Sequence, residues 1–197
     1  MGADIHLFSE KKKSINGEEK WVNCDHWMIN PHFGEHEREP ELEVVSLYSN
    51  RDYDLFGILA DVRGGGPSIC GPKGLPDDVS PIVKKESERW EDDGHSHSYF
   101  TLAELKEYYK YNNDTPVNGF ISVKQAEELD SGESKPEWWS EWSSPHKVYR
   151  EWKQDSPLKT LINNVYEKMR KEFWVKDEDE NVSEFDEKIR IVFWFDN

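Results

Sequence analysis

The sequence predicts a single α+β domain over residues 1–197, with a mainly antiparallel sheet that contains an N-terminal hairpin and a C-terminal strand. An Asn16-Gly17 pair between two strand-like runs is the pattern of a β-hairpin. Apolar residues recur at helical spacing over residues 157–174. Residues 189–195 are strongly apolar and suit a central strand. This mixed order of strands and helices is typical of an α+β fold, here with about four helices packed on the sheet.

The N-terminal half is expected to hold the hairpin and two of the helices. Residues 3–9 place apolar side chains on one face, and residues 20–27 would be the returning strand. Residues 55–62 are apolar and precede a run of glycines and a proline, which predicts a buried helix that ends there. Ser80-Pro81 is the pattern of an N-cap with proline at the first helical position, so a helix is expected to about residue 90.

The C-terminal half is expected to hold the other two helices. Residues 95–100 are extended, and Thr101 with Glu104 forms a capping box that opens a helix over residues 102–111. The last helix is the amphipathic run described above. The remaining segments are predicted as a loop over residues 112–119, a short strand over 120–123 and an irregular, acidic, tryptophan-rich stretch over 127–144.

Acidic residues dominate the composition. The chain has 25 Lys and Arg against 41 Asp and Glu, which gives a formal charge of −16. Nucleic-acid binding needs clustered Lys and Arg, so direct binding to nucleic acid is not expected. The negative charge also repels anionic membranes. It allows one special function, in which surface carboxylates imitate the phosphate backbone of a nucleic acid. Two cysteines and no signal-peptide pattern favour a reduced, cytoplasmic protein without a membrane segment.

Two short motifs could carry chemistry, Asp4-x-His6 and His95-x-His97. If each lies on a strand, residues two apart point to the same face, so each pair of side chains would project together. Imidazole and carboxylate are ligands of divalent metals, and the four residues are a candidate site for Zn or Mn. The alternative is that the histidines form structural hydrogen bonds near a helix N-terminus and that Asp4 caps a turn.

A second constellation follows at Arg51-Asp52-Tyr53-Asp54. Arg51 can hold a phosphate or carboxylate with two parallel hydrogen bonds, and Tyr53 can stack or donate a hydrogen bond. The alternative is an ion pair of Arg51 that fixes a helix entrance. No catalytic residue can be assigned. The candidate ligand-binding residues are Arg51, Tyr53, Asp54, Asp61, His95 and His97.

The two histidine motifs resemble, locally, those of calcineurin-like metallophosphoesterases. That class uses Asp-x-His after its first strand and Gly-His-x-His late in the chain, which match Asp4, His6, Gly94, His95 and His97 here. The Gly-Asp and Gly-Asn-His blocks that the class needs between them are absent from this sequence. The resemblance therefore implies a metal-dependent phosphodiesterase only as a minority hypothesis.

A wider resemblance links the chain to a largely uncharacterised family of bacteriophage and prophage proteins. It rests on the strings MGADIHLF, RDYDLF, LADVR, GLPDDVS and GHSHS, and on FWFDN at the end of the sequence. The resemblance implies a viral accessory protein made in the bacterial cytoplasm. By analogy of class, such a protein would counteract a host defence.

Three hypotheses for function stay open. The first is a protein that binds a nucleotide-like or phosphate-bearing ligand in a His/Asp/Arg pocket. The second is a metal-dependent phosphoester hydrolase that uses the same residues. The third is an acidic inhibitor or nucleic-acid mimic that binds a host defence protein, motivated by the glutamates that alternate over residues 35–43 and by the acidic run at 177–180. Exposed tryptophans would also favour a homodimer.

Overall fold

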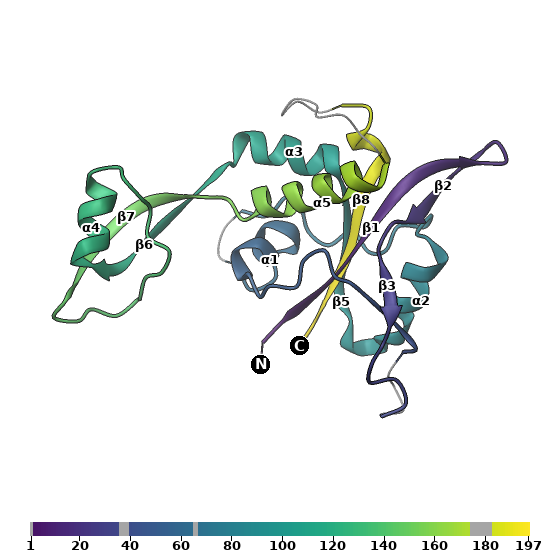
Figure 1. The fold of residues 1–197 in the computed structure, drawn as a ribbon, viewed down its shortest axis with the longest axis horizontal. Helices are drawn as coiled ribbons and strands as arrows, with labels where there is room; N and C mark the ends of the chain where they lie inside the picture. The colour runs from purple at the N-terminus through teal and green to yellow at the C-terminus, as the bar shows by residue number, and fades with distance from the viewer. Residues whose placement is uncertain (1, 36–39, 65–66, 174–182) are drawn as a thin grey trace. The chain divides into compact units, whose positions relative to one another are not determined.

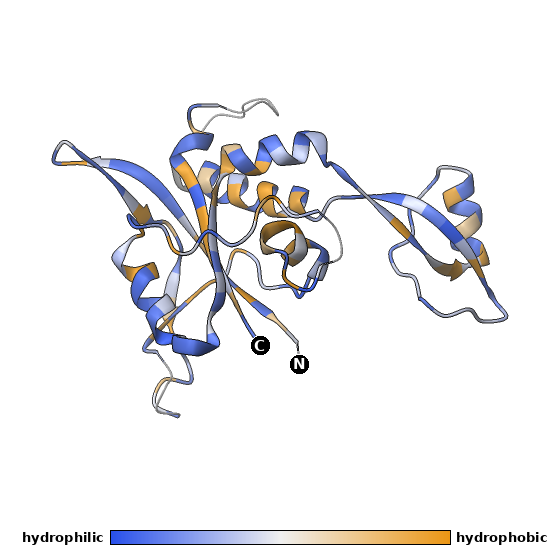
Figure 2. Cartoon of the chain, turned by 180° about the vertical axis from the view of Figure 1, so that it is seen from behind, coloured by the Kyte–Doolittle hydropathy of each residue, from blue (hydrophilic) through white to orange (hydrophobic). Residues whose placement is uncertain are grey.

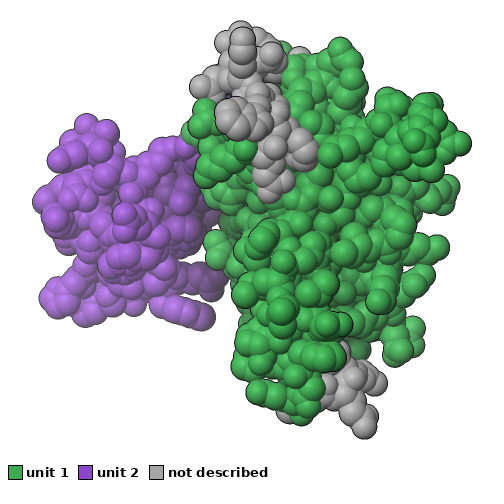
Figure 3. Space-filling model, turned by 45° about the vertical axis from the view of Figure 1, so that its right-hand side comes forward, with its two compact units in different colours: residues 1–111, 157–197 green, residues 112–156 purple. Residues whose placement is uncertain are grey.

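The computed structural model describes residues 2–35, 40–64, 67–173 and 183–197. These residues form an α+β structure with α-helices α1–α5 and strands β1–β8 (Figure 1). They fall into two compact units, which are coloured separately in Figure 3. Unit 1 is Met1–Tyr111 with Pro157–Asn197, and unit 2 is Asn112–Ser156. The α+β class is confirmed, whereas the extent of a single domain over residues 1–197 stays a prediction.

The main sheet of unit 1 has the strand order β2-β1-β8-β5, and its neighbours pair antiparallel. Its strands are β1 (Asp4–Ile15), β2 (Glu18–Asn23), β5 (His95–Thr101) and β8 (Ile189–Asp196). The predicted hairpin is confirmed: Asn16 and Gly17 turn the chain with φ angles of 55° and 83°, as a tight hairpin turn needs. The C-terminal strand β8 is central, between β1 and β5, as its apolar sequence predicts.

Three helices share one core with the first face of this sheet: α1 (Tyr53–Ala60), α3 (Leu102–Tyr111) and α5 (Leu158–Phe173). Leu7 of β1 and Phe193 of β8 pack there against Leu161 of α5. Figure 2 shows apolar residues on the central strands and in stripes along the helices. Sequence patterns placed all three helices within two residues of their observed bounds.

The second face of the sheet carries a smaller core and the elements that shape the candidate site. Phe8, Val192 and Trp194 pack there against Val83 of α2 (Pro81–Arg89). The 3-10 turn η1 (Glu91–Asp93) follows α2, and a small hairpin packs Trp27 of β3 and Val44 of β4 against the same core. The remaining bounds of unit 1 are β3 (Trp27–Ile29), β4 (Leu42–Val44) and η2 (Asp186–Lys188).

A buried ion pair fixes the start of α2. Glu10 of β1 is fully buried, and its Oε2 accepts a hydrogen bond of 2.7 Å from Arg190 Nε. Its other carboxylate oxygen accepts the backbone N–H of Ser80 at 2.8 Å. Arg190 also donates to the Asp78 side chain at 2.6 Å and stacks on Trp21 at 4.1 Å. The N-cap residue of α2 is thereby tied to the centre of the sheet.

Unit 2 contains β6 (Asp114–Ser122), α4 (Val123–Asp130) and β7 (Lys147–Asp155). The two strands pair antiparallel, and α4 begins with a capping box between Ser122 and Gln125. Ile121, Ala126 and Trp152 form its small core. The predicted loop over residues 112–119 and the irregular stretch over 127–144 are wrong in part, because β6 and the end of α4 occupy them. Few apolar side chains mark these elements, so hydrophobic periodicity is weak here.

Candidate functional site

Asp4 and His6 lie on one face of β1, as the sequence predicts, opposite Asp196 and Trp194 of β8. Asp4 is engaged by Arg51 through two parallel hydrogen bonds, each of 2.6 Å. These hydrogen bonds hold the pKa of Asp4 below its usual range. Arg51 therefore forms an ion pair with a carboxylate of the protein itself. The sequence allowed an ion pair of Arg51 as the alternative to ligand binding.

His6 sits between two tryptophans on the second face of the sheet. Its ring centroid is 4.0 Å from that of Trp90 and 5.8 Å from that of Trp194. The Nε2 atom is buried and lies 3.4 Å from Asp196 Oδ2, a close contact of imidazole and carboxylate. The Nε1 atoms of both tryptophans are also buried without a hydrogen-bond partner among the described residues.

The expectation that His95 and His97 project together is wrong. The four residues of β5 from His95 to Ser98 lie opposite only three residues of β8, from Phe195 to Phe193, so β5 contains a bulge. Ser96 takes a left-handed conformation at this point, with φ of 53°. His95 therefore stacks on Phe195 at 6.2 Å, on the first face of the sheet, while His97 stacks on Trp194 at 5.4 Å, on the second.

Each of these histidines has a different partner. His97 Nε2 lies 2.9 Å from the Ser87 hydroxyl of α2. His95 Nε2 lies 3.0 Å from the Asn197 side-chain nitrogen. Among the residues that the structure describes, no group of three or more His, Cys, Asp or Glu could hold a metal ion. The four-residue metal site with Zn or Mn stays a prediction that this geometry does not support.

The other candidate residues belong to the ends of α1. The side chain of Asp52 caps the helix by accepting the Leu55 N–H at 3.1 Å. Tyr53 and Asp54 form the exposed first turn. Asp61 is the C-cap, in a left-handed conformation with φ of 56°. These residues stabilise the ends of α1, and none of the described contacts joins them to His97.

Burial gives His6 and His97 a common titration behaviour. Burial lowers the pKa of each below the ordinary value of 6.5, and Asp196 opposes the shift at His6. The folded protein therefore favours neutral imidazoles, and the unfolded chain binds more protons below about pH 6.5. Their contribution to stability is complete above that pH and is lost as the pH falls through the lower folded-state pKa values.

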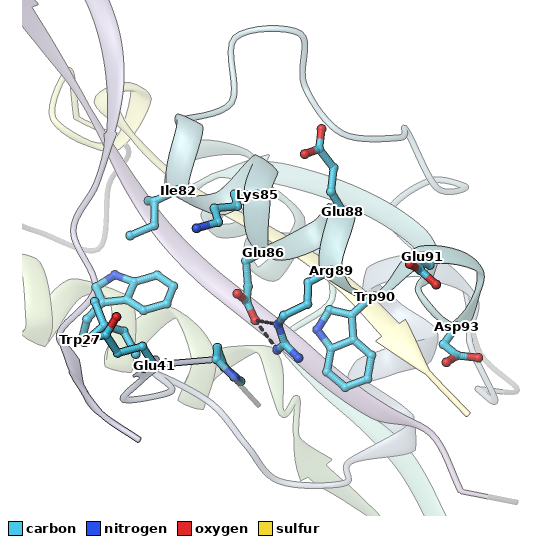
Figure 4. Close-up of a pocket in the computed structure, with 12 residues that line it drawn as sticks. Trp27, Glu41, Ile82, Lys85, Glu86, Glu88, Arg89, Trp90, Glu91 and Asp93 are labelled. Atoms are coloured by element: carbon cyan, nitrogen blue, oxygen red, sulfur yellow. Dashed lines mark hydrogen bonds and ion pairs between the residues drawn. The ribbon is translucent and has the colours of Figure 1, made fainter. Parts of the chain in front are cut away.

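A pocket of about 860 Å³ lies beside this histidine–tryptophan cluster, and we call it the tryptophan pocket. Figure 4 shows Trp27 of β3 and Trp90 at the end of α2 on opposite sides of it. The ion pair between Glu86 and Arg89 lies between them. Trp27 is held by a hydrogen bond of 2.9 Å from its Nε1 to Asn23. Trp90 packs its ring on His6, so the pocket adjoins one of the sequence motifs.

Carboxylates dominate the charge of the tryptophan pocket. Glu86 is neutralised by Arg89, whose guanidinium lies 5.2 Å from the Trp90 ring centroid. Within the described ranges, the other pocket carboxylates form no ion pair; they are Glu41, Glu88, Glu91 and Asp93. Among the described lining residues, Lys85 is the other cation. The pocket therefore offers aromatic faces and an excess of negative charge.

Comparisons with known proteins do not assign the chain to a family. No family model, no curated protein and no solved structure matches the chain. The resemblance to a phage family therefore stays a prediction from its motifs.

Sequence reasoning did not find the tryptophan pocket. Trp27 and Trp90 are far apart in the sequence and become neighbours of one cavity only because the β3–β4 hairpin and α2 pack on the same sheet face. A usable signal was the pattern along α2, where Ile82, Lys85 and Arg89 recur at helical spacing on the side away from the buried Val83.

Other predictions about composition have mixed outcomes. In the part of the chain that the structure describes, no helix is long and apolar enough to cross a membrane. Glu41 of the alternating glutamates lines the tryptophan pocket. Glu37, Glu39 and the acidic run at 177–180 lie outside the described residues.

Proposed function

We propose that this protein acts by binding, and that its tryptophan pocket takes a cationic side chain, arginine or lysine, of a protein partner. The observation that carries the proposal is the combination of two tryptophan walls with carboxylates that no ion pair neutralises among the described residues. A cation held against a tryptophan face gains about 0.5–2 kcal/mol, and more as water is excluded. Carboxylates around the ring add attraction of the same sign.

The size and the overall charge of the protein support the same ligand class. The cavity of about 860 Å³ is large enough for a guanidinium or ammonium group with its aliphatic stem and neighbouring residues. The formal charge of −16 would draw a basic surface toward the protein over distances of about a Debye length. This ligand class agrees with the third hypothesis from the sequence, an acidic inhibitor that binds a host defence protein.

A phosphate-bearing ligand fits this geometry less well. Of the residues that the sequence suggested for it, Arg51 is engaged by Asp4, and His95 and His97 lie on opposite faces of the sheet. The carboxylates of the tryptophan pocket would repel a phosphate. The nucleotide-binding and metal-hydrolase hypotheses therefore have no described site that supports them as well.

The biological setting of the proposal comes from the sequence motifs. We propose that the partner is a host defence protein and that this chain blocks it in the bacterial cytoplasm, as the phage-family resemblance implies. An acidic pocket for a basic side chain supports inhibition by occupation of a basic surface. This step rests on the motifs and can fail while the pocket proposal holds.

Calorimetric titration with a tetra-arginine peptide tests the ligand class, with AMP as the nucleotide probe. We expect the peptide to bind and AMP not to bind. Trp27→Ala should weaken peptide binding at least about tenfold, because each tenfold loss equals about 1.4 kcal/mol, within the range of a desolvated cation–π contact. Trp142→Ala is the matched control, because Trp142 is 77% exposed and lies in unit 2.

A second pair of variants separates the pocket from the general acidity of the protein. Glu41→Gln with Glu91→Gln removes two pocket charges, and Glu137→Gln with Glu141→Gln removes two exposed charges in unit 2. Only the pocket variant should weaken binding strongly. Equal weakening by both double variants, or tight binding of AMP instead of the peptide, would overturn the proposal.

A further inference from the structure

Strand β7 of unit 2 has an open edge. It pairs with β6 alone, and no third strand pairs with it in the ranges that the structure describes. On the far side of β6, Phe120 exchanges two backbone hydrogen bonds with Ser140. Phe120 is opposite Tyr149, so this pair is not hydrogen-bonded within the ribbon, and the backbone groups of Tyr149 point away from β6.

The same alternation places the backbone groups of Glu151 and Lys153 at the outer edge of β7. Pro116, which has no N–H, stands opposite Lys153, as a position without ladder hydrogen bonds requires. The side chains at these edge positions are exposed, and Tyr149 is 46% exposed. The Tyr149 carbonyl accepts a hydrogen bond of 3.0 Å from the Arg150 side chain, which a pairing strand would displace. Exposed strand edges are templates for pairing with another strand.

We propose that two copies of this chain associate by antiparallel pairing of their β7 edges. The two-fold axis would pass at Trp152, so that Glu151 of each copy faces Lys153 of the other. In the same register, Tyr149 of each copy faces Asp155 of the other, and the phenol would exchange its hydrogen bond to Glu151 for one to that carboxylate. An isologous contact of this kind is self-complementary and closes as a dimer.

The charge pattern of β7 selects this register among those that preserve backbone pairing. A two-fold axis at Glu151 would place that carboxylate opposite its own copy, and an axis at Lys153 would oppose two ammonium groups. Like charges directly opposite each other destabilise strand pairing, whereas opposite charges stabilise it by about 0.2–1 kcal/mol per pair. Only the axis at Trp152 gives opposite charges at both Glu151–Lys153 contacts while it pairs most of the strand.

The other face of β7 offers an independent reason for a second strand. Trp152 Nε1 and Gln154 Oε1 are buried and have no hydrogen-bond partner among the described residues. In the proposed register, Gln154 stands opposite Arg150 of the second copy, whose guanidinium pairs with Asp130 and donates to the Tyr149 carbonyl within its own copy. Trp152 stands diagonal to Gln154 of the second copy, so a donor and an acceptor that are each unsatisfied in one copy come within side-chain reach of each other.

This inference concerns unit 2 and does not depend on the tryptophan pocket. Sedimentation equilibrium over a concentration series tests it. The wild-type protein should approach twice the monomer mass as its concentration rises. Glu151→Lys and Lys153→Glu should each remain monomeric, because each variant alone opposes like charges twice at the interface.

The deciding sample is an equimolar mixture of the two single variants. In a heterodimer the two substituted positions face each other with opposite charges, and the unaltered Lys153 and Glu151 also attract, so the mixture should associate. The controls are Lys124→Glu and Glu127→Lys on α4, which change the same charges at exposed positions of unit 2 away from the edge and should dimerise like wild type. A monomeric wild type, a monomeric mixture, or controls that dissociate as completely as the edge variants would overturn the proposal.

Discussion

Replacement of Arg190 by methionine should destabilise unit 1 and loosen the wall of the tryptophan pocket. Arg190 is 3% exposed and Glu10 is fully buried, and their side chains are joined by a hydrogen bond of 2.7 Å. The same Glu10 carboxylate accepts the N–H of Ser80, the N-cap of α2. Since α2 carries the pocket residues Lys85 and Arg89, the pair links the centre of the sheet to the candidate site.

The magnitude follows from what the substitution leaves behind. The Glu10 carboxylate would keep one backbone hydrogen bond but lose its only described counter-charge, in a site that water does not reach. Breaking a buried pair in this way costs about 3–5 kcal/mol. Replacement of both partners by methionine removes the stranded charge and should recover most of that loss, although the Ser80 N–H then loses its acceptor.

Urea unfolding of wild type, both single variants and the double variant gives a double-mutant cycle. We expect Arg190→Met to lower the free energy of unfolding by about 3–5 kcal/mol and the coupling energy to exceed about 2 kcal/mol. A loss below about 1 kcal/mol, or a double variant as unstable as the sum of the single variants, would refute the reasoning from a buried, mutually compensated pair.

Three further variants have expected outcomes. In Gly57→Ala the new Cβ would lie 2.6 Å from the Gly64 Cα, so the free energy of unfolding should fall by about 1–3 kcal/mol; an unchanged urea midpoint would contradict this close approach. Replacement of His6 and His97 by glutamine should reduce the loss of stability as the pH falls below about 6.5, and a wild-type pH dependence of unfolding would count against it. Thr101→Ala should cost about 1 kcal/mol in thermal or urea unfolding, because it removes the capping hydrogen bond of α3, and no cost would show that the cap is unimportant.

Local signals predicted most of unit 1. The Asn16-Gly17 turn, the Ser80-Pro81 start of α2 and the capping box at Thr101 each act within a few residues, and each is found where the sequence places it. The central position of β8 followed from its apolar sequence. The turn and the helix starts depend on a few neighbouring residues, and the central position of β8 depends on how apolar the strand is. Both kinds of feature can therefore be predicted from one sequence.

The features that were not predicted depend on contacts between residues that are distant in the sequence. The bulge in β5 places His97 and His95 on opposite faces of the sheet, and no residue type in that strand predicts a bulge. Strand β7 was missed because its exposed positions are polar and its core face offers little more than Trp152. The tryptophan pocket needs Trp27 and Trp90 to meet across elements that are distant in sequence. Pairing and packing across such distances are not encoded in local periodicity.

The side-chain N–H resonances of the tryptophans test the central claim most directly. The chain has 9 tryptophans, each with one indole N–H, and single substitutions assign the signals of Trp27 and Trp90. In a titration of the ¹⁵N-labelled protein with the tetra-arginine peptide, we expect the largest saturable shifts at these two indoles and little change at Trp142, which is exposed in unit 2. Shifts centred on Trp142, or no saturable shift at Trp27 and Trp90, would contradict a cation-binding tryptophan pocket.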